Sequence, residues 1–446
     1  MLPTATSVTG QPGALLASRK DTPAWSLPTR IIFRFGVIYF GLYVLTTQMQ
    51  SSLIRIPKRE VPEVSGTKWA VGVSSWVARH VMHVTGEFVT RSTGSGDRTL
   101  DWAWTIVLFG AGVAGAIGWS LLTRRRAHPL AQTWFTVFLR FALGATMLTY
   151  GFSKVFPLQM PPPSLQRLLE PYGSFSPMGV LWYSVGASPA YEIFVGSAEA
   201  AGGVLLMIPR LALLGALVTL ADVVEVFVLN MTYDVPVKLF SFHLILMSLF
   251  LLAPEMRRLA GVVVMNRAVG PSTRRPLFTR RTAMRLAVGL QLLAAAYFVS
   301  LNVYGGWRAM RSRSATISPL YGIWDVTDLS NDDHARAPLL SDTNRWRRVI
   351  FWQQPAVMSF QLMNDAFSGF ACAINTNAHT VTLTKGPSEQ NWKATLTYAR
   401  PDNDSMTLDG TMDAHRIHAQ LHRVDHRNFL LLSRGFHWMQ EFPFNR

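Results

Sequence analysis

Seven apolar segments, each roughly 18 to 24 residues long, constrain the fold of this chain more than any other feature. A hydrocarbon core of ~30 Å is crossed by about 20 consecutive apolar residues in an α-helix. Charged residues make up only 15% of the sequence, against about 25% in soluble domains. The sequence therefore predicts a polytopic α-helical membrane protein. The segments are 31–49, 103–122, 132–154, 190–208, 211–230, 238–254 and 283–304.

Basic residues gather in alternate connections between these segments. This distribution predicts how the segments are oriented across the membrane. Cytoplasmic loops carry the excess of Lys and Arg, so these connections are predicted to be cytoplasmic. The N-terminus is then on the cytoplasmic side of a bacterial inner membrane, and everything after Gly305 is on the outer side. Topology thus accounts for the net charge of +16 and leaves no basic face for nucleic acid. The basic residues are Arg19, Lys20, Arg30, Arg124 to Arg126, Arg210 and the arginines between 257 and 281.

The character of the sequence changes after Arg313. Short runs of alternating hydrophobicity appear, among them YGIWDVTDL, HTVTLTK and IHAQLHRV, and turn signals separate them. This pattern is typical of an antiparallel barrel or sandwich. Gly322-x-Trp324, with Arg434 expected to stack on the Trp, resembles the lipocalin pattern. The resemblance implies a lipocalin-like barrel outside the membrane.

The chain divides into six predicted parts. Two outer loops, 50–102 and 155–189, are long enough to suggest function. Trp182 and Tyr183 suit a membrane interface, so the second loop is expected to lie on the membrane or to re-enter it. The parts are a disordered cytoplasmic tail without a cleavage site (1–29), two spans with a long outer loop (30–129), a four-helix core (130–256), a basic cytoplasmic loop (257–282), a seventh span (283–304) and the β domain (315–446).

Ionisable residues interrupt the apolar segments between 132 and 254. An ionisable side chain at the bilayer centre costs at least ~2.5 kcal/mol, so these side chains have partners, a cavity or a function. Arg140, Gly144, Gly151 and Lys154 share one helical face. At 1.5 Å of rise per residue, Arg140 and Glu199 each lie roughly 13 Å from the cytoplasmic ends of their spans. We therefore predict that they form a mid-membrane ion pair.

Together the polar side chains of these spans form a predicted wedge, widest at the outer surface. One interpretation is a structural ion-pair network that orients four packed helices. The other is an outward-facing pocket that binds a ligand or relays protons. The candidates for the pocket are Arg140, Tyr150, Lys154, Glu192, Glu199, Asp222, Glu225, Asn230, Lys238 and His243.

Two motifs in this region resemble the DoxX-like family of membrane proteins. They are Arg140-x-x-Leu-Gly144, continuing to Tyr150-Gly151-Phe152-x-Lys154, and Glu199-x-x-Gly202-Gly203-x-Leu-Leu-x-x-Pro-Arg210. The resemblance covers roughly residues 130 to 255 and implies a four-helix membrane bundle. Relatives in that family include a subunit of a thiosulfate:quinone oxidoreductase. This chain adds two spans before the core, one after it, and the outer β domain.

Two functions fit these features, and whether the chain is an enzyme stays open. In the first, it is a membrane component of redox- or quinone-linked metabolism. Arg140, Lys154 and Lys238 would stabilise negative charge, and the acidic residues of the wedge and His243 would carry protons. No haem, flavin or nucleotide motif is present, so electrons would have to come from quinone or from a redox partner subunit. In the second, the chain is a non-enzymatic binding, transport or assembly protein whose barrel captures an apolar ligand or partner.

Four smaller signals carry structural expectations. The histidines from His415 to His426 are expected on a strand, with His418 and His422 facing solvent. His80 and His83 are expected on a solvated amphipathic helix. The stretch TGSGDRT is expected to form a turn in which Asp97 or Asp101 caps the second span. Cys372, the only cysteine, excludes an internal disulfide and is expected to be a buried strand residue.

Overall fold

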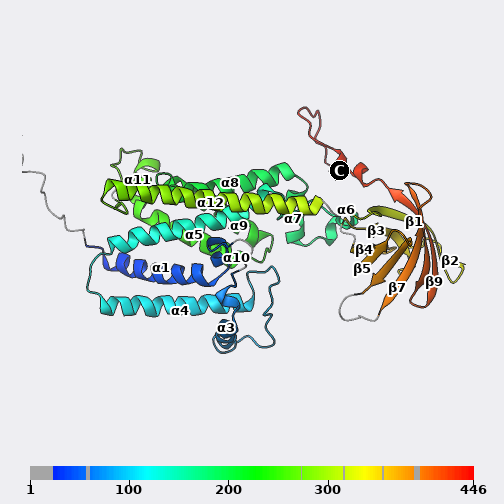
Figure 1. The fold of residues 1–446 in the computed structure, drawn as a ribbon, viewed down its shortest axis with the longest axis horizontal. Helices are drawn as coiled ribbons and strands as arrows, with labels where there is room; N and C mark the ends of the chain where they lie inside the picture. Colours follow the sequence, from blue (N-terminus) through cyan, green and yellow to red (C-terminus); the bar gives the residue numbers. More distant parts are fainter. Residues whose placement is uncertain are drawn as a thin grey trace, which may run out of the picture. The chain divides into compact units, whose positions relative to one another are not determined.

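The computed structural model of the chain describes residues 24–56, 61–272, 274–314, 317–353, 356–385 and 392–445. A set of long helices precedes an all-β domain (Figure 1), which confirms the predicted fold class. Most of the tail predicted over 1–29, with Arg19 and Lys20, lies outside the described residues.

Within the described ranges, seven helices are long and apolar enough to cross a membrane. This confirms the predicted spans, although several of the helices run further than their apolar stretches, the sixth and seventh by the most. The sixth continues through α11 to Val263, and Arg258 in α11 pairs with Glu255 one turn earlier. Their bounds are α1 Leu27–Thr46, α4 Thr99–Leu122, α5 Pro129–Val155, α8 Pro189–Met207, α9 Ala212–Thr232, α10 Lys238–Leu252 with α11 Met256–Val263, and α12 Arg281–Ser314.

Contacts divide the chain into two compact units. The first holds the described residues up to Met147, with 202–227 and 236–296. The second holds 148–201, 228–235 and 297–445. The helices α5 and α8 each contribute one part to each unit, so both units contain a segment of the membrane helices.

Glycines let α5 and α8 approach closely. A Cβ at Gly144 would lie 2.9 Å from the carbonyl oxygen of Gly203, and one at Gly151 would lie 2.7 Å from that of Gly196. Any larger side chain there would collide with backbone, which cannot move aside. Small residues at such positions are the usual means of packing membrane helices.

The loop 50–102 contains α2 (Met49–Leu53, which begins just before it) and α3 (Lys68–His80). In α3, Val77 and Ala78 pack against Ala103 of α4, whereas Trp69 and Trp76 are exposed. The helix predicted around His80 is therefore present, but it ends at that residue. His83 has a left-handed backbone, with φ of 56°, so the two histidines do not share a helical face.

The loop 155–189 packs on the β domain, a contact that the sequence did not predict. It contains α6 (Leu165–Leu169) and α7 (Pro177–Gly186). Leu165 is buried in a cluster with Ile323 and Ile350. The hydroxyl of Ser359 donates to Oε1 of Gln166 at 3.3 Å. The α6 helix therefore covers outward-facing apolar side chains of the sheet.

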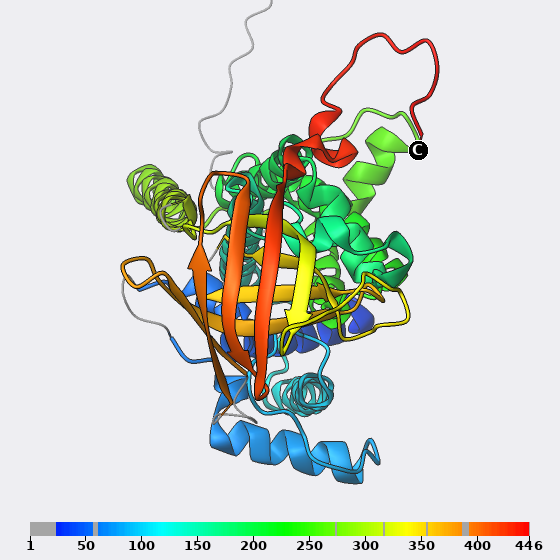
Figure 2. The ribbon, with the colours of Figure 1, turned by 90° about the vertical axis from the view of Figure 1, so that its right-hand side faces the viewer.

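Eight antiparallel strands of the described chain close into a barrel, because β1 pairs with β9 as well as with β3. Figure 2 shows yellow β1 beside red β9. The two-residue strand β2 pairs only with β1 among the described strands. The strands are β1 Gly322–Asn331, β2 His334–Ala335, β3 Trp346–Phe351, β4 Val357–Leu362, β5 Phe367–Asn375, β6 Thr380–Thr384, β7 Lys393–Ala399, β8 Ser405–Met412 and β9 His415–Val424.

Alternate side chains of these strands fill the barrel interior. Trp324 and Phe360 are almost completely buried in this core, and Cys372 belongs to it, as predicted. The rings of Trp346 and Phe360 stack at 3.9 Å. On β9 the apolar side chains are buried, while the side chain of His422 is exposed and that of His418 reaches Asp409. The predicted strand with outward histidines is therefore confirmed.

The cation that stacks on Trp324 is Arg400 and not Arg434. The Arg400 guanidinium lies 5.4 Å from the Trp324 ring, and it donates to the carbonyl of Pro319. Arg434 follows α13 (Leu430–Ser433) and lies over Phe444. The prediction was wrong because α13 leads the chain on after β9, whereas Arg400 directly follows β7.

Candidate functional site

A buried ion pair joins α5 to α8 within the second unit. Nζ of Lys154, in the last turn of α5, lies 2.5 Å from Oε1 of Glu199. Their side chains are only 6% and 3% exposed. A pair so deeply buried is costly to form and still more costly to break, because removal of one partner leaves an uncompensated charge.

The predicted Arg140–Glu199 ion pair is wrong, since Glu199 pairs with Lys154. Nε of Arg140 donates to the carbonyl of Leu206 at 2.7 Å, and a terminal nitrogen donates to that of Met207 at 3.0 Å. The last carbonyls of a helix have no intrahelical partner. Arg140 thus caps the C-terminal end of α8, where a cation is also favoured by the helix dipole.

Glu192 lies two turns before Glu199 on α8, and its side chain is fully buried. Its Oε1 accepts a hydrogen bond from the amide of Met160 at 2.9 Å. Its Oε2 is buried without a hydrogen bond to any described residue. The ammonium of Lys154 interacts electrostatically with it. The structure therefore brings together three of the predicted residues, Lys154, Glu192 and Glu199, which we call the acid–base site.

In the first unit, hydrogen bonds within α10 and to α1 hold the His243 ring in place. Its Nδ1 lies 2.7 Å from the carbonyl of Leu239, and its Nε2 lies 2.7 Å from the hydroxyl of Tyr39. A carbonyl only accepts, so we assign the proton to Nδ1, and Nε2 then accepts from Tyr39. The ring also stacks on Tyr43 at 3.9 Å. Both nitrogens are thus engaged, and the ring joins α1 to α10.

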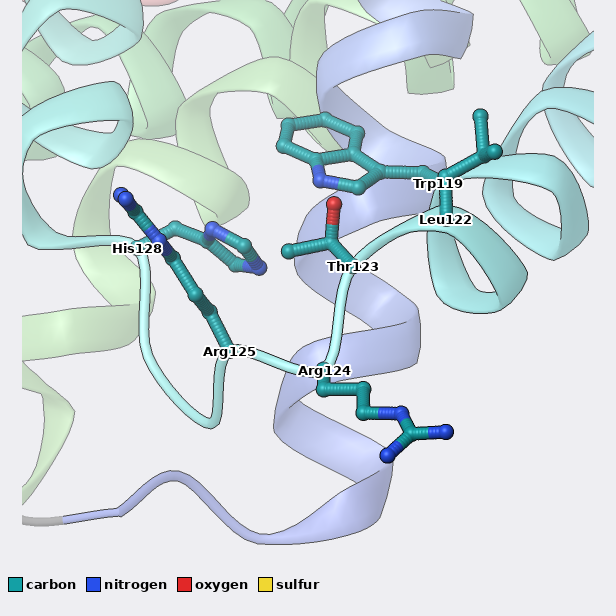
Figure 3. A pocket seen from close by; sticks show the side chains of 6 residues that line it. All are labelled: Trp119, Leu122, Thr123, Arg124, Arg125 and His128. Atoms are coloured by element: carbon teal, nitrogen blue, oxygen red, sulfur yellow. The ribbon is translucent and has the colours of Figure 1, made fainter.

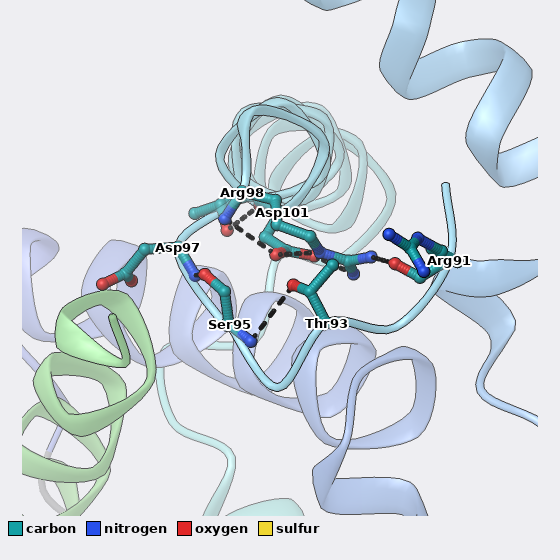
Figure 4. A network of polar contacts seen from close by, with 7 residues as sticks. Arg91, Thr93, Ser95, Asp97, Arg98 and Asp101 are labelled. Atoms are coloured by element: carbon teal, nitrogen blue, oxygen red, sulfur yellow. Dashed lines mark hydrogen bonds and ion pairs between the residues drawn. The ribbon is translucent and has the colours of Figure 1, made fainter. Parts of the chain in front are cut away.

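Asp97 in the TGSGDRT stretch and Asp101 just after it each cap a helix, and Figure 4 shows both residues. Asp101 accepts from the backbone amide of Arg98 at the start of α4, which confirms the predicted cap. Asp97 instead accepts from the backbone amides of Lys238 and Leu239 at 2.8 and 2.9 Å. Its Oδ2 lies 4.0 Å from the Lys238 ammonium. Lys238 therefore helps to fasten the first long loop to α10.

The same loop lines a small pocket of about 150 Å³ with side chains of α1, α4 and α10. Glu63 is part of this lining. Burial raises the pKa of the Glu63 carboxyl above its ordinary value, and the charge of Asp101 adds to the effect. The charge of Arg98 acts in the opposite direction.

The remaining predicted residues lie on α5 and α9. Tyr150 and Asp222 are half-buried, and Asn230 is buried. Glu225 is exposed although it lies within an apolar span. That all ten predicted residues line one pocket stays a prediction. Within the described ranges, no group of three or more His, Cys, Asp or Glu side chains is placed to hold a metal ion.

Our sequence analysis missed a second cluster of charge, centred on Arg34. This arginine is only 3% exposed. It bonds Ser120 Oγ at 2.7 Å and the carbonyls of Thr123 and Arg125. The sequence did contain a signal for it, because Arg34 falls inside the first predicted span.

Comparisons with known proteins give one partial relative. The chain is 36% identical over 83 residues to the uncharacterised protein YwoB of Bacillus subtilis strain 168. The match covers 19% of this chain and 54% of YwoB, so the chain spans about half the length of that relative. No family model matches the chain, and no solved structure matches it significantly.

Proposed function

We propose that this chain is a membrane protein of the DoxX-like type and that its acid–base site exchanges protons during a quinone-linked process. The observation that carries the proposal is the buried Oε2 of Glu192, which has no hydrogen bond to a described residue. Burial of a carboxylate oxygen without a hydrogen bond is unfavourable for the charged form, so it favours the neutral carboxyl. Glu192 can then donate a proton, and the nearby Lys154–Glu199 pair can receive one.

The proposed site needs no reaction other than proton transfer. The carboxyl of Glu192 would donate a hydrogen bond to the carbonyl or hydroxyl group of a quinone-type ligand, and the Lys154 ammonium would stabilise negative charge on it. Glu199 balances the charge of Lys154 while no ligand is bound. We leave Arg140, Lys238 and His243 out of the site, because each has partners that fasten helices or loops.

The filled interior of the barrel weakens the alternative function. Capture of an apolar ligand would have to displace buried side chains such as Trp324, Phe351 and Phe360, each at most 1% exposed. Displacing well-packed side chains is costly. We therefore favour the membrane helices over the barrel as the place where a small ligand acts.

The test is infrared spectroscopy of the full-length protein in nanodiscs over a range of pH. A neutral carboxyl has a carbonyl band that an ionised carboxylate lacks. We expect Glu192→Gln to remove a band that persists at neutral pH. The matched control Glu170→Gln should leave it, since Glu170 is ion-paired to Arg167 in a loop.

The ligand arm of the test uses decylubiquinone as the probe. Adding decylubiquinone should shift the Glu192 band in the wild type. Decylubiquinone should also bind more weakly to the Lys154→Met variant than to the wild type. A protein without the band contradicts proton exchange at Glu192. If decylubiquinone does not shift the band, the site does not act on a quinone. Only the proposed proton exchange at Glu192 then stands.

A further inference from the structure

Five arginines gather around the loop between α4 and α5. Three belong to the loop, Arg124 to Arg126, and two belong to α1, Arg30 and Arg34. The ion pairs of the described residues join none of the five to a carboxylate. Charges of one sign so close together repel each other, and an anion from outside the chain would relieve that repulsion.

The buried side chain of Arg34 holds the loop in place. Arg34 bonds two loop carbonyls, and its guanidinium also lies 3.1 Å from Nε2 of His128. The loop carbonyls are therefore turned inward, while the side chains of Arg124 and Arg125 remain exposed. Nε of Arg30 is buried without a hydrogen bond to a described residue. This N–H of the Arg30 guanidinium could therefore donate to a bound ligand.

An open pocket of about 690 Å³ lies at this loop (Figure 3), lined by Trp119, Leu122, Thr123, Arg124, Arg125 and His128. In that view Arg125 extends along the His128 ring, whereas Arg124 points away from it. The rings of Trp119 and His128 are 5.2 Å apart. The pocket thus combines a basic rim with an aromatic wall.

His128 adds a neutral donor to the pocket. Burial lowers the pKa of its ring, and the positive charges of Arg34, Arg125 and Arg30 lower it further. The ring is therefore uncharged at neutral pH. Since Nε2 accepts from Arg34, we assign the hydrogen of the ring to Nδ1.

We propose that this pocket binds the phosphate group of an anionic phospholipid. Guanidinium groups match phosphate oxygens in pairs, which makes arginine the preferred residue for this headgroup. Leu121 and Leu122 are 80% and 89% exposed beside the pocket, and they offer an apolar path for the acyl chains. Basic pockets at the ends of membrane helices bind such headgroups.

Lipid titration of the delipidated, full-length protein in detergent tests the proposal. Phosphatidylglycerol should raise the melting temperature, and phosphatidylcholine and inorganic phosphate should not. In Arg124→Gln/Arg125→Gln, phosphatidylglycerol should bind about fivefold more weakly for each arginine removed. Both side chains are exposed, so the variant should fold normally.

The matched control is Arg257→Gln/Arg267→Gln, which removes two exposed arginines from the other basic segment. It should bind phosphatidylglycerol as the wild type does. Equal weakening in both variants would mean unspecific attraction to basic loops. Unchanged binding in the Arg124/Arg125 variant, or equal stabilisation by inorganic phosphate, would also overturn the lipid site.

Discussion

Three buried cations of the described chain, Arg34, Arg140 and Lys154, have three different kinds of partner. Arg140 bonds carbonyls at a helix end, Lys154 pairs with a carboxylate, and Arg34 bonds loop carbonyls and an imidazole. The type of partner determines what a substitution leaves behind. Loss of Lys154 strands a carboxylate, whereas loss of Arg140 strands neutral carbonyls, which are less costly to leave unbonded.

The Lys154–Glu199 pair can be tested by a double-mutant cycle. We expect Lys154→Met and Glu199→Gln each to destabilise the protein, with the loss of Lys154 on the order of 3–5 kcal/mol, because the remaining charge is buried and unpaired. The double variant should lose much less than the sum of the single losses. Thermal unfolding in detergent measures all three.

Arg140→Leu combined with Glu199→Gln is the control cycle. The structure gives these residues separate partners, so their losses should add. Strong coupling between Arg140 and Glu199 would instead support the pair that the sequence predicted.

Cys372 provides a probe of the barrel core. Burial raises the pKa of its thiol to about 11 from an ordinary value of 9.0. Because thiolate is the reactive form, the folded protein should react with iodoacetamide about a hundredfold more slowly than the unfolded chain at neutral pH. Alkylation followed by mass spectrometry, with and without urea, gives both rates. Similar rates would mean that the core is open to solvent.

At the scale of elements, the glycines of α5 and α8 determine which residues of the two helices contact each other. The positions of the ends of the apolar segments do not. Gly144 meets Gly203, and Gly151 meets Gly196. Continued along both helices, this pairing places Arg140 opposite Met207, where its bonds are found. Both glycine faces are visible in the sequence. Depth measured from the ends of the apolar segments misplaces Arg140, because α5 begins before its apolar segment does.

The packing of α6 on the barrel was not predictable from the pattern of hydrophobicity. Five helical residues are too few to show a period, and the partners Ile323 and Ile350 are distant in sequence. By contrast, the strands were predictable, because each run alternates over many residues and a turn signal follows it. Contacts between distant segments therefore required the structure.

Leu165 should be the main anchor of α6. Leu165→Ala removes a buried side chain from the cluster with Ile323 and Ile350, which should cost about 2–5 kcal/mol in local stability. Hydrogen exchange of the backbone amides in β1 and β3 should become faster. Tyr172→Ala, at a 76% exposed position in the same loop, is the control and should leave exchange unchanged. Unchanged exchange in Leu165→Ala would show that α6 does not stabilise the sheet.

At the scale of the whole molecule, contacts group the β domain with further segments of the chain. The second compact unit joins it to α6, α7 and parts of α5 and α8. Hydropathy predicted where the membrane part ends, since that depends on composition alone. It could not predict that an outer loop belongs with the barrel, because this depends on a surface that exists only after the strands have paired.

The arrangement of the ends across the membrane is the last prediction. An odd number of spans places the two ends on opposite sides, and the described chain has seven candidate spans. The arginines at 124–126 and 257–281 predict that their loops are cytoplasmic, so the barrel should lie outside. A reporter that fluoresces only in the cytoplasm should be dark when fused after Arg446 and bright when fused after Arg267. A protease added to intact spheroplasts should cut the first fusion and spare the second. Bright fluorescence after Arg446 would mean that α12 does not cross the membrane, and reversal of both signals would mean that the whole chain is inverted.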